Sequence, residues 1–293
     1  MTLSNFLANI YVPARLDLRP SSIEQLAVTI RLLDRHLGRP AKVAELSTQL
    51  VRQFLFVYRS HVAPATVNDK RRHLMALWRF AHEEGHCRNA PGKIATMKEP
   101  QRLPEAWTIT EIEALLATCR ALPGDVGSIP RRYWWAACVL TVYDTGGRIG
   151  AVRSTLTADF SCAERCLVVR SEVDKSYRDR LFWLSDQTVA AIAAIHDPHQ
   201  PELFPWPYCR QYLWRFFRRQ IVEPAGLQAT TRGMGLFHKL RRTTLSYLAV
   251  QDLAIAQQQA GHSDPRLTLR RYVDPKIAQT RSAVDILPRP NLD

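Results

Sequence analysis

Apolar residues recur at helical spacing three times in the first 85 residues. The first run follows a capping box formed by Ser21 and Glu24 and ends at Gly38. The second run follows Ser47, and the third begins near Pro64. The apolar positions of the three runs are Leu26, Ile30, Leu33, Leu37, Leu50, Phe54, Val57, Tyr58, Val67, Leu74, Leu77, Trp78 and Ala81. This pattern predicts a domain of three or four helices over residues 1–95.

The periodicity lapses between Asn89 and Trp107, a stretch with three prolines and several charges. Such a stretch is typical of a linker, which we place at residues 96–106. Helical spacing resumes after Thr110, which is expected to form a second capping box with Glu113. Residues 107–293 are therefore expected to form a second domain.

The second domain combines long apolar runs with two short segments typical of strands. Tyr133–Val142 is nearly continuous in apolar residues and predicts a buried helix. Residues 166–170 and 180–184 are β-branched or aromatic and predict a β-hairpin. Further helices are expected at 209–221, 238–251, 252–260 and 265–273. The predicted fold class is mainly α with a small antiparallel β-sheet (α+β).

The charge balance favours a polyanionic partner. The 293 residues carry 40 Lys and Arg against 27 Asp and Glu, a formal net charge of +13. Such an excess suits DNA, RNA or an anionic membrane surface. Lys70, Arg71 and Arg72 form a basic cluster on the third predicted helix, which fits either a phosphate backbone or a solvated helix face. The chain has neither an apolar run long enough to span a membrane nor a signal-peptide pattern, so we expect a cytoplasmic protein without a membrane partner.

The cysteines point to neither disulfides nor a metal. The six of them are scattered, which in a chain of this size is typical of reduced thiols. Cys162 and Cys166 form a CxxxC pair, but only Cys209, His196 and His199 follow as further ligand candidates. A structural zinc site needs two paired ligand sets, so no metal and no cofactor are expected.

Three short stretches hold residues that together could grip and attack one phosphate. A phosphodiester under attack needs cationic donors on its non-bridging oxygens, a nucleophile in line and an acid on the leaving oxygen. The stretches are TGGRIG (145–150), HKLRRT (238–243) and GHSDPRLTLRRY (261–272). Their candidate residues are Arg148, His238, Arg241, His262 and Tyr272, to which Lys175 is added from outside the three stretches. Neither a P-loop nor a carboxylate cluster typical of Mg²⁺ sites accompanies them.

Each candidate, taken alone, also fits a structural role. Arg148 follows two glycines after a buried helix, which suits a structural arginine as well as a phosphate ligand. His238 and Arg241 are three residues apart, so one helix would direct both to the same side and Arg242 to another. Tyr272 alone fits a core tyrosine. Charged neighbours of Tyr272 instead favour a phenol that needs nearby cations to stabilise its anion.

In this order and spacing, the three stretches resemble the conserved boxes of the tyrosine recombinases of the phage integrase family. TGGRIG resembles the first-arginine box, HKLRRT the histidine–arginine box and AGHSDPRLTLRRY the box that ends in the nucleophile. Three further segments extend the similarity over nearly the whole chain: EEGHCRNAP (83–91), TITEIEALL (108–116) and LFPW (203–206). The resemblance implies a helical core-binding domain and a catalytic domain that close on DNA as a C-shaped clamp.

The resemblance also implies a role for each matched residue. Tyr272 would attack the scissile phosphate and form a 3′-phosphotyrosyl bond, with release of a 5′-hydroxyl strand. Arg148 and Arg241 would bind the non-bridging oxygens, since charge accumulates there in the transition state. His238 would assist proton transfer at the nucleophile, and His262 would donate a hydrogen bond to the phosphate. Because the covalent intermediate conserves the bond energy, neither metal nor ATP would be required.

Two positions depart from the family pattern or leave a choice open. Ala151 stands where the family usually has an acidic residue, three positions after the first arginine, which puts the local hydrogen-bond network in doubt. The acid for the leaving 5′-oxygen is assigned to Lys175, although Arg178 and Arg180 lie on the same hairpin. Lysine is preferred because an arginine cannot release a proton near neutral pH.

The implied function is site-specific DNA recombination through a Holliday junction. The partner would be double-stranded DNA, bound by a homotetramer on two sites that is a monomer or weak dimer when free. Apolar residues after Tyr272, including Ile277 and Leu287, would either pack against a neighbouring subunit or fold back onto their own subunit. A topoisomerase IB-like nicking-closing enzyme and a catalytically silent DNA-binding protein are the alternatives. The expected lack of an arm-binding domain favours a simple recombinase, nucleoid-associated in a bacterial cytoplasm.

Overall fold

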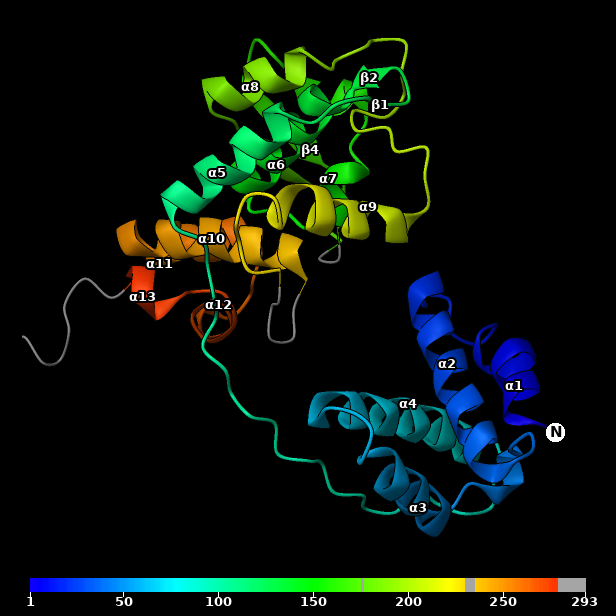
Figure 1. Cartoon of the computed structure of the whole chain (residues 1–293). Coiled ribbons are helices and arrows are strands. Elements are labelled where there is room, and N and C mark those ends of the chain that lie inside the picture. The colour runs from blue at the N-terminus through cyan, green and yellow to red at the C-terminus, as the bar shows by residue number, and fades with distance from the viewer. Residues whose placement is uncertain (175–176, 230–234, 279–293) are drawn as a thin grey trace, which may run out of the picture. The chain divides into compact units, whose positions relative to one another are not determined.

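The chain forms two compact units, Met1–Gln101 (unit 1) and Arg102–Asp293 (unit 2). The structure is a computed structural model and describes residues 1–174, 177–229 and 235–278. Both units are mostly helical, and the described strands belong to unit 2 (Figure 1). The predicted fold class, mainly α with small antiparallel sheets, is confirmed. Among the described residues, no helix is both long and apolar enough to cross a membrane.

Unit 1 is built from four α-helices whose apolar stripes share one core. They are α1 (Leu3–Phe6, continued by a π-helical turn at Leu7–Tyr11), α2 (Pro20–Leu37), α3 (Thr48–Tyr58) and α4 (Pro64–Glu83). A 3₁₀ turn at Val43–Glu45 joins α2 to α3. Trp78, fully buried on α4, donates its indole N–H to the carbonyl of Asn89 at 2.8 Å. The apolar runs of the sequence thus mark three of these helices, and the short α1 is a fourth, whose position was not predicted.

The residues that begin and end α2 and α3 agree with the sequence prediction at some of these ends and not at others. The predicted capping box of Ser21 and Glu24 is wrong, because α2 begins at Pro20 and Glu24 instead accepts a hydrogen bond from Arg31 at 2.7 Å. Proline suits the first helical position, since its φ is already fixed near the helical value. Gly38 ends α2 with a φ of +69°, as predicted. Ser47 caps α3 by accepting from Leu50 N–H.

The segment around the boundary at residues 101 and 102 contacts unit 1 through its first half and unit 2 through its second half. Ile94 is buried in the core of unit 1, and its carbonyl accepts from Arg71 Nε at 2.8 Å. Farther along, Ala106 and Trp107 belong to unit 2, where their backbone N–H groups donate to Asp274 and Thr243, each at 2.8 Å. The contacts therefore change from one unit to the other between residues 99 and 106, since Glu99 still accepts from Asn68 on α4.

Unit 2 is arranged around α6 (Arg131–Thr145), which is buried along most of its length. Trp135 on α6 stacks on three phenylalanine rings, Phe216, Phe217 and Phe237, at centroid distances of 5.4–6.3 Å. The other helices are α5 (Ile109–Arg120), α7 (Ile149–Arg153), α8 (Asp186–Ala193), α9 (Arg210–Phe216, continued as a π-helical turn to Val222), α10 (Leu236–Gln251), α11 (Leu253–Ala260), α12 (Pro265–Arg271) and α13 (Pro275–Ala278). The aromatic core fixes α6, whose C-terminal end leads into the TGGRIG turn.

The predicted capping box of Thr110 and Glu113 is wrong by two residues. Instead, Thr108 accepts from Glu111 N–H at 3.2 Å, and Glu111 accepts from Thr108 N–H at 2.7 Å. The sequence contains two overlapping Thr-x-x-Glu patterns, and the earlier one caps α5 because the chain is already held at Trp107 by Thr243.

The predicted hairpin is present, and the structure adds a third strand to it. The antiparallel sheet has the order β3 (Phe160–Ser161), β4 (Cys166–Val169) and β5 (Arg180–Trp183). Leu167 pairs with Phe182 and Val169 with Arg180. A second small hairpin joins β1 (Asp125–Val126) and β2 (Ile129–Pro130). The register places Arg180 at the end of the sheet next to the β4–β5 loop.

Candidate active site

The TGGRIG turn holds Arg148 in place through the two glycines that precede it. Gly146 ends α6 with a φ of +55°, a conformation that favours glycine. Gly147 has no room for a side chain, because an added Cβ would lie 2.9 Å from Thr145 Oγ1 and Val152 Cγ2. Arg148 then starts α7 as its N-cap, with a side chain that is 27% exposed. The arginine thus projects from a rigid turn and remains accessible to a ligand.

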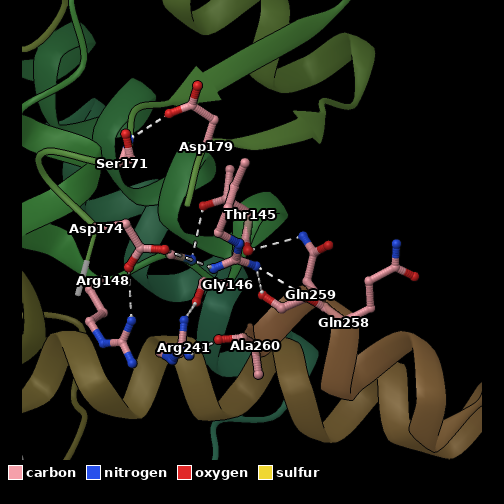
Figure 2. Close-up of polar contacts among 12 residues, drawn as sticks. Thr145, Gly146, Arg148, Ser171, Asp174, Asp179, Arg241, Gln258, Gln259 and Ala260 are labelled. Atoms are coloured by element: carbon pink, nitrogen blue, oxygen red, sulfur yellow. Dashed lines mark hydrogen bonds and ion pairs between the residues drawn. The ribbon is translucent and has the colours of Figure 1, made fainter. Parts of the chain in front are cut away.

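Helix α10 directs two neighbouring arginines to different places. Arg241 is almost fully buried and donates to the carbonyl of Gly146 and, at 2.8 Å, to the carbonyl of Ala260 (Figure 2). Arg242 donates to the carbonyl of Glu105 at 3.3 Å. The i, i+3 spacing from His238 therefore brings Arg241 to the turn, and Arg242 points elsewhere, as expected from the helical period.

Arg241 connects three segments that are far apart in sequence. Its guanidinium joins α10 to the first-arginine turn and to the C-terminal end of α11, and its Cζ lies 5.1 Å from the centre of the Tyr272 ring. Burial and the neighbouring charges of Arg148 and Arg180 lower the pKa of Arg241 to about 10, against opposing contributions from Tyr272. Arg241 is still a cation at neutral pH.

His262 lies in the same group and is neutral at neutral pH. Burial, followed by the positive charges of Arg241, Arg148 and Arg180, lowers its pKa to about 4. Nδ1 lies 2.9 Å from Thr268 Oγ1 on α12, whereas Nε2 is buried without a hydrogen-bond partner among the described residues. A buried nitrogen of this kind is expected to find a partner when a ligand binds.

Tyr272 sits at the C-cap of α12, with its ring among these cationic and imidazole groups. The tyrosine is 8% exposed, and its ring centre lies 4.8 Å from that of His262 and 6.4 Å from that of His238. Ser246 Oγ on α10 donates to the Tyr272 carbonyl at 3.2 Å and accepts from Asp274 N–H at 2.8 Å. The end of α12 is thereby tied to the helix that carries His238 and Arg241.

Five of the six candidates therefore belong to one site. Arg148, His238, Arg241, His262 and Tyr272 are linked by the ring contacts and mutual charge effects given above. The sixth, Lys175, lies outside the described residues.

Arg180 and Asp174 also belong to this group, and neither was among the candidates. Arg180 donates to the carbonyls of Gln258 and Gln259 at 3.2 and 2.6 Å, and Asp174 accepts from Arg148 at 3.2 Å. Arg180 and His262 line one pocket of about 560 Å³, which gives a ligand access to this side of the site. The sequence signal for Arg180 was its place on the predicted hairpin, but its partners are 78 and 79 residues away.

The basic cluster on α4 is only partly exposed. Lys70 is 5% exposed and burial lowers its pKa, whereas Arg71 donates to the carbonyl of Ile94. Arg72 is exposed and pairs with Asp69 at 2.7 Å. Lys70 lies on the buried stripe of α4, which argues against a phosphate contact by its ammonium group. DNA contacts by Arg71 and Arg72 stay a prediction. The described residues contain no group of three or more His, Cys, Asp or Glu arranged to hold a metal ion.

Comparisons with known proteins identify a family and several relatives of this chain. A sequence profile described as the phage integrase family matches residues 106–278. Tyrosine recombinase XerD of Lacticaseibacillus casei is 26% identical over 229 residues, which cover 73% of this chain and 74% of the relative. Among solved structures, the Tn1549 transposon integrase in complex with a circular intermediate DNA has a TM-score of 0.69 at 15% identity, covering 93% of this chain and 95% of the other. A lambda integrase dimer bound to a core site has the same TM-score at 16% identity, with both chains fully covered.

Proposed function

The chain belongs to the phage integrase family, and we propose that it is a site-specific DNA recombinase that cuts and rejoins DNA through a 3′-phosphotyrosine. The observation that carries the proposal is the group around Tyr272. A buried arginine and two histidines from α10 and the segment after α11 surround one tyrosine ring. A tyrosine that only filled the core would have no need of such neighbours.

The first step would be attack of Tyr272 Oη on the scissile phosphorus. The bond between phosphorus and the 5′-oxygen breaks, a phosphotyrosyl bond forms, and the strand leaves with a 5′-hydroxyl. Arg148, on its turn, and Arg241, on α10, would bind the two non-bridging oxygens. Preorganised cations of this kind stabilise the charge that develops in the transition state and cost no reorganisation during the step.

The two histidines would differ in role because their surroundings differ. His262 is neutral, and Nε2 is the nitrogen that has no described partner. We assign the proton to Nε2, so that Nδ1 would accept the hydrogen bond from the Thr268 hydroxyl. Nε2 would then donate to a phosphate oxygen. His238, whose ring centre lies 6.4 Å from that of Tyr272, would accept the phenol proton. Lys175 would protonate the leaving 5′-oxygen, an assignment that rests on the sequence resemblance.

Strand exchange would complete the reaction. The 5′-hydroxyl of a partner duplex attacks the phosphotyrosyl bond, tyrosine leaves, and two such exchanges pass through a Holliday junction. Four protomers on two DNA sites would be needed, in keeping with the family. Support for DNA as the partner comes from the net charge of +13 and from the DNA bound to the two structural relatives. We assign residues 1–95 to a core-binding domain and residues 107–293 to the catalytic domain.

A covalent-trapping experiment tests the proposal. The purified protein would be incubated with nicked fragments of its source genome, and DNA that stays linked to protein in SDS would be sequenced to identify the site. A synthetic nicked duplex of that site should give an SDS-resistant adduct with the wild type and none with Tyr272→Phe, although both bind it. Exchange between two labelled duplexes would separate a recombinase from a topoisomerase-like enzyme. A wild type that binds the site but forms no adduct would refute catalysis.

A further inference from the structure

Asp174 lies between two arginines of the site. Its Oδ1 accepts from Arg148 Nη1 at 3.2 Å, and its Oδ2 lies 3.8 Å from Arg180 Nη1. The aspartate side chain is 3% exposed, compared with 27% for Arg148 and 14% for Arg180. Figure 2 shows the Asp174 carboxylate directed toward the active-site arginines. One buried carboxylate thus serves two guanidinium groups, and it engages Arg148 through a single nitrogen of the fork.

The backbone around Asp174 is fixed by the start of the β4–β5 loop. Its N–H donates to the carbonyl of Arg170 at 3.1 Å, and its own carbonyl accepts from Tyr177 N–H at 3.3 Å. Ser171 N–H donates to Asp179 Oδ1 at 2.7 Å, which ties the two sides of the loop together (Figure 2). These hydrogen bonds fix the backbone that carries the Asp174 carboxylate.

Arg180 extends this arrangement to the turn that carries His262. Its Nη2 donates to two carbonyls in the last turn of α11, those of Gln258 and Gln259. Gly261 ends α11 with a φ of +66°, and a Cβ there would lie 3.1 Å from Arg180 Nη1. His262 follows directly. A contact chain therefore runs from Arg148 through Asp174 and Arg180 to the backbone next to the imidazole.

The charges explain why a carboxylate is needed at this point. Arg148 and Arg180 are close enough for the charge of Arg148 to lower the pKa of Arg180, an effect that Asp174 opposes, and burial lowers it most. Without the carboxylate, two guanidinium groups would repel each other in a partly desolvated place. Position 151 supplies no acid, because it is an alanine. Ala151 is buried in an apolar cluster with Val169 and Phe182.

We propose that Asp174 is a positioning residue for phosphodiester cleavage. It aims Arg148 at the phosphate and, through Arg180, holds the His262 turn. In this chain the β4–β5 loop thereby supplies the carboxylate that is absent from the α7 position 151. The inference rests on the proposed recombinase activity and adds a residue to its site.

Asp174→Asn tests the inference, because asparagine keeps the shape and removes the charge. On the nicked duplex, single-turnover cleavage should fall by roughly 100-fold, the effect typical of an active-site group displaced by about 1 Å. Duplex affinity should be unchanged or tighter, since the site loses one negative charge. Asp174→Glu should restore part of the cleavage rate. Asp159→Asn is the matched control: Asp159 is a buried aspartate directly before β3 that binds Arg170, directly after β4, at 2.7 Å, and this variant should cleave normally.

Three results would overturn the inference while leaving the recombinase proposal intact. Cleavage by Asp174→Asn at the wild-type rate would make Asp174 unnecessary, and faster cleavage would make it inhibitory. Cleavage, affinity and melting temperature could also fall together as they would in a misfolded protein, with no rescue by glutamate. Failure of the wild type to form an adduct would instead refute the proposed function.

Discussion

Substitution of Arg241 by lysine separates the effect of the guanidinium fork from that of its charge. Lysine keeps the positive charge but presents one nitrogen instead of a planar fork. Arg241 spans two carbonyls, Gly146 on the first-arginine turn and Ala260 at the end of α11. The lysine ammonium presents its donors from one nitrogen on a shorter side chain, so we expect it to lose at least one of the two hydrogen bonds that Nη1 and Nη2 of Arg241 make.

The expected losses follow from these contacts. A hydrogen bond from a charged donor contributes about 1.5–3 kcal/mol, so Arg241→Lys should lower the free energy of unfolding by about that amount. The cleavage rate should fall more steeply, by roughly 10²–10³-fold, because the same fork would bind a non-bridging oxygen beside Tyr272. Urea unfolding monitored by tryptophan fluorescence would measure the first, and single-turnover adduct formation the second.

Arg242→Lys is the matched control on the same helix. Arg242 is also buried, but its described hydrogen bond goes to the Glu105 carbonyl, away from the turn and α11. Its replacement should cost stability and leave cleavage within about tenfold of the wild type, far less than the loss expected for a transition-state donor. Equal losses of cleavage in the two variants would refute the distinction drawn between them, as would near-normal cleavage by Arg241→Lys.

Two further predictions concern the turn and the imidazole. Gly147→Ala should lower the free energy of unfolding by about 1–3 kcal/mol, as overpacking does, because its Cβ would meet Thr145 and Val152; Gly150→Ala, where nothing lies within 4 Å of the added Cβ, is the control, and equal melting temperatures would contradict the packing argument. An NMR titration should find the pKa of His262 at about 4, lowered from 6.5 chiefly by burial. As the pH falls, the unfolded chain takes up this proton before the folded chain does. The contribution of His262 to the free energy of unfolding should therefore be complete above pH 6.5 and be lost as the pH falls toward 4. His262→Gln should flatten this pH dependence. A His262 that titrates near pH 6.5 would show that the cations and burial do not act on it.

Local patterns in the sequence were sufficient for much of the fold. Residues 180–184 were expected to pair with 166–170, and they do so because alternation and turn residues act over short distances. Lys70 shows where a local signal was overlooked. It falls between Val67 and Leu74 on the apolar stripe of α4, so the helical period alone already places it on the buried face.

The parts that escaped prediction depend on contacts between distant segments. Asp174 meets Arg148 across 26 residues, and Arg180 meets the end of α11 across 78. Neither contact has a local signature in the sequence. Asp174 is a loop side chain, and the partners of Arg180 at the end of α11 are backbone carbonyls. The overlapping Thr-x-x-Glu patterns before α5 were likewise decided by a tertiary contact, that of Trp107 with Thr243.

Mass mapping of the trapped adduct tests the central claim most directly. The wild-type protein would be linked to the nicked duplex, digested with protease and nuclease, and the nucleotide-bearing peptide sequenced by tandem mass spectrometry. The account predicts a single modified peptide with the nucleotide on Tyr272, joined through a 3′-phosphate, and a free 5′-hydroxyl on the released strand. A nucleotide attached to any other residue, or through a 5′-phosphate, would contradict it.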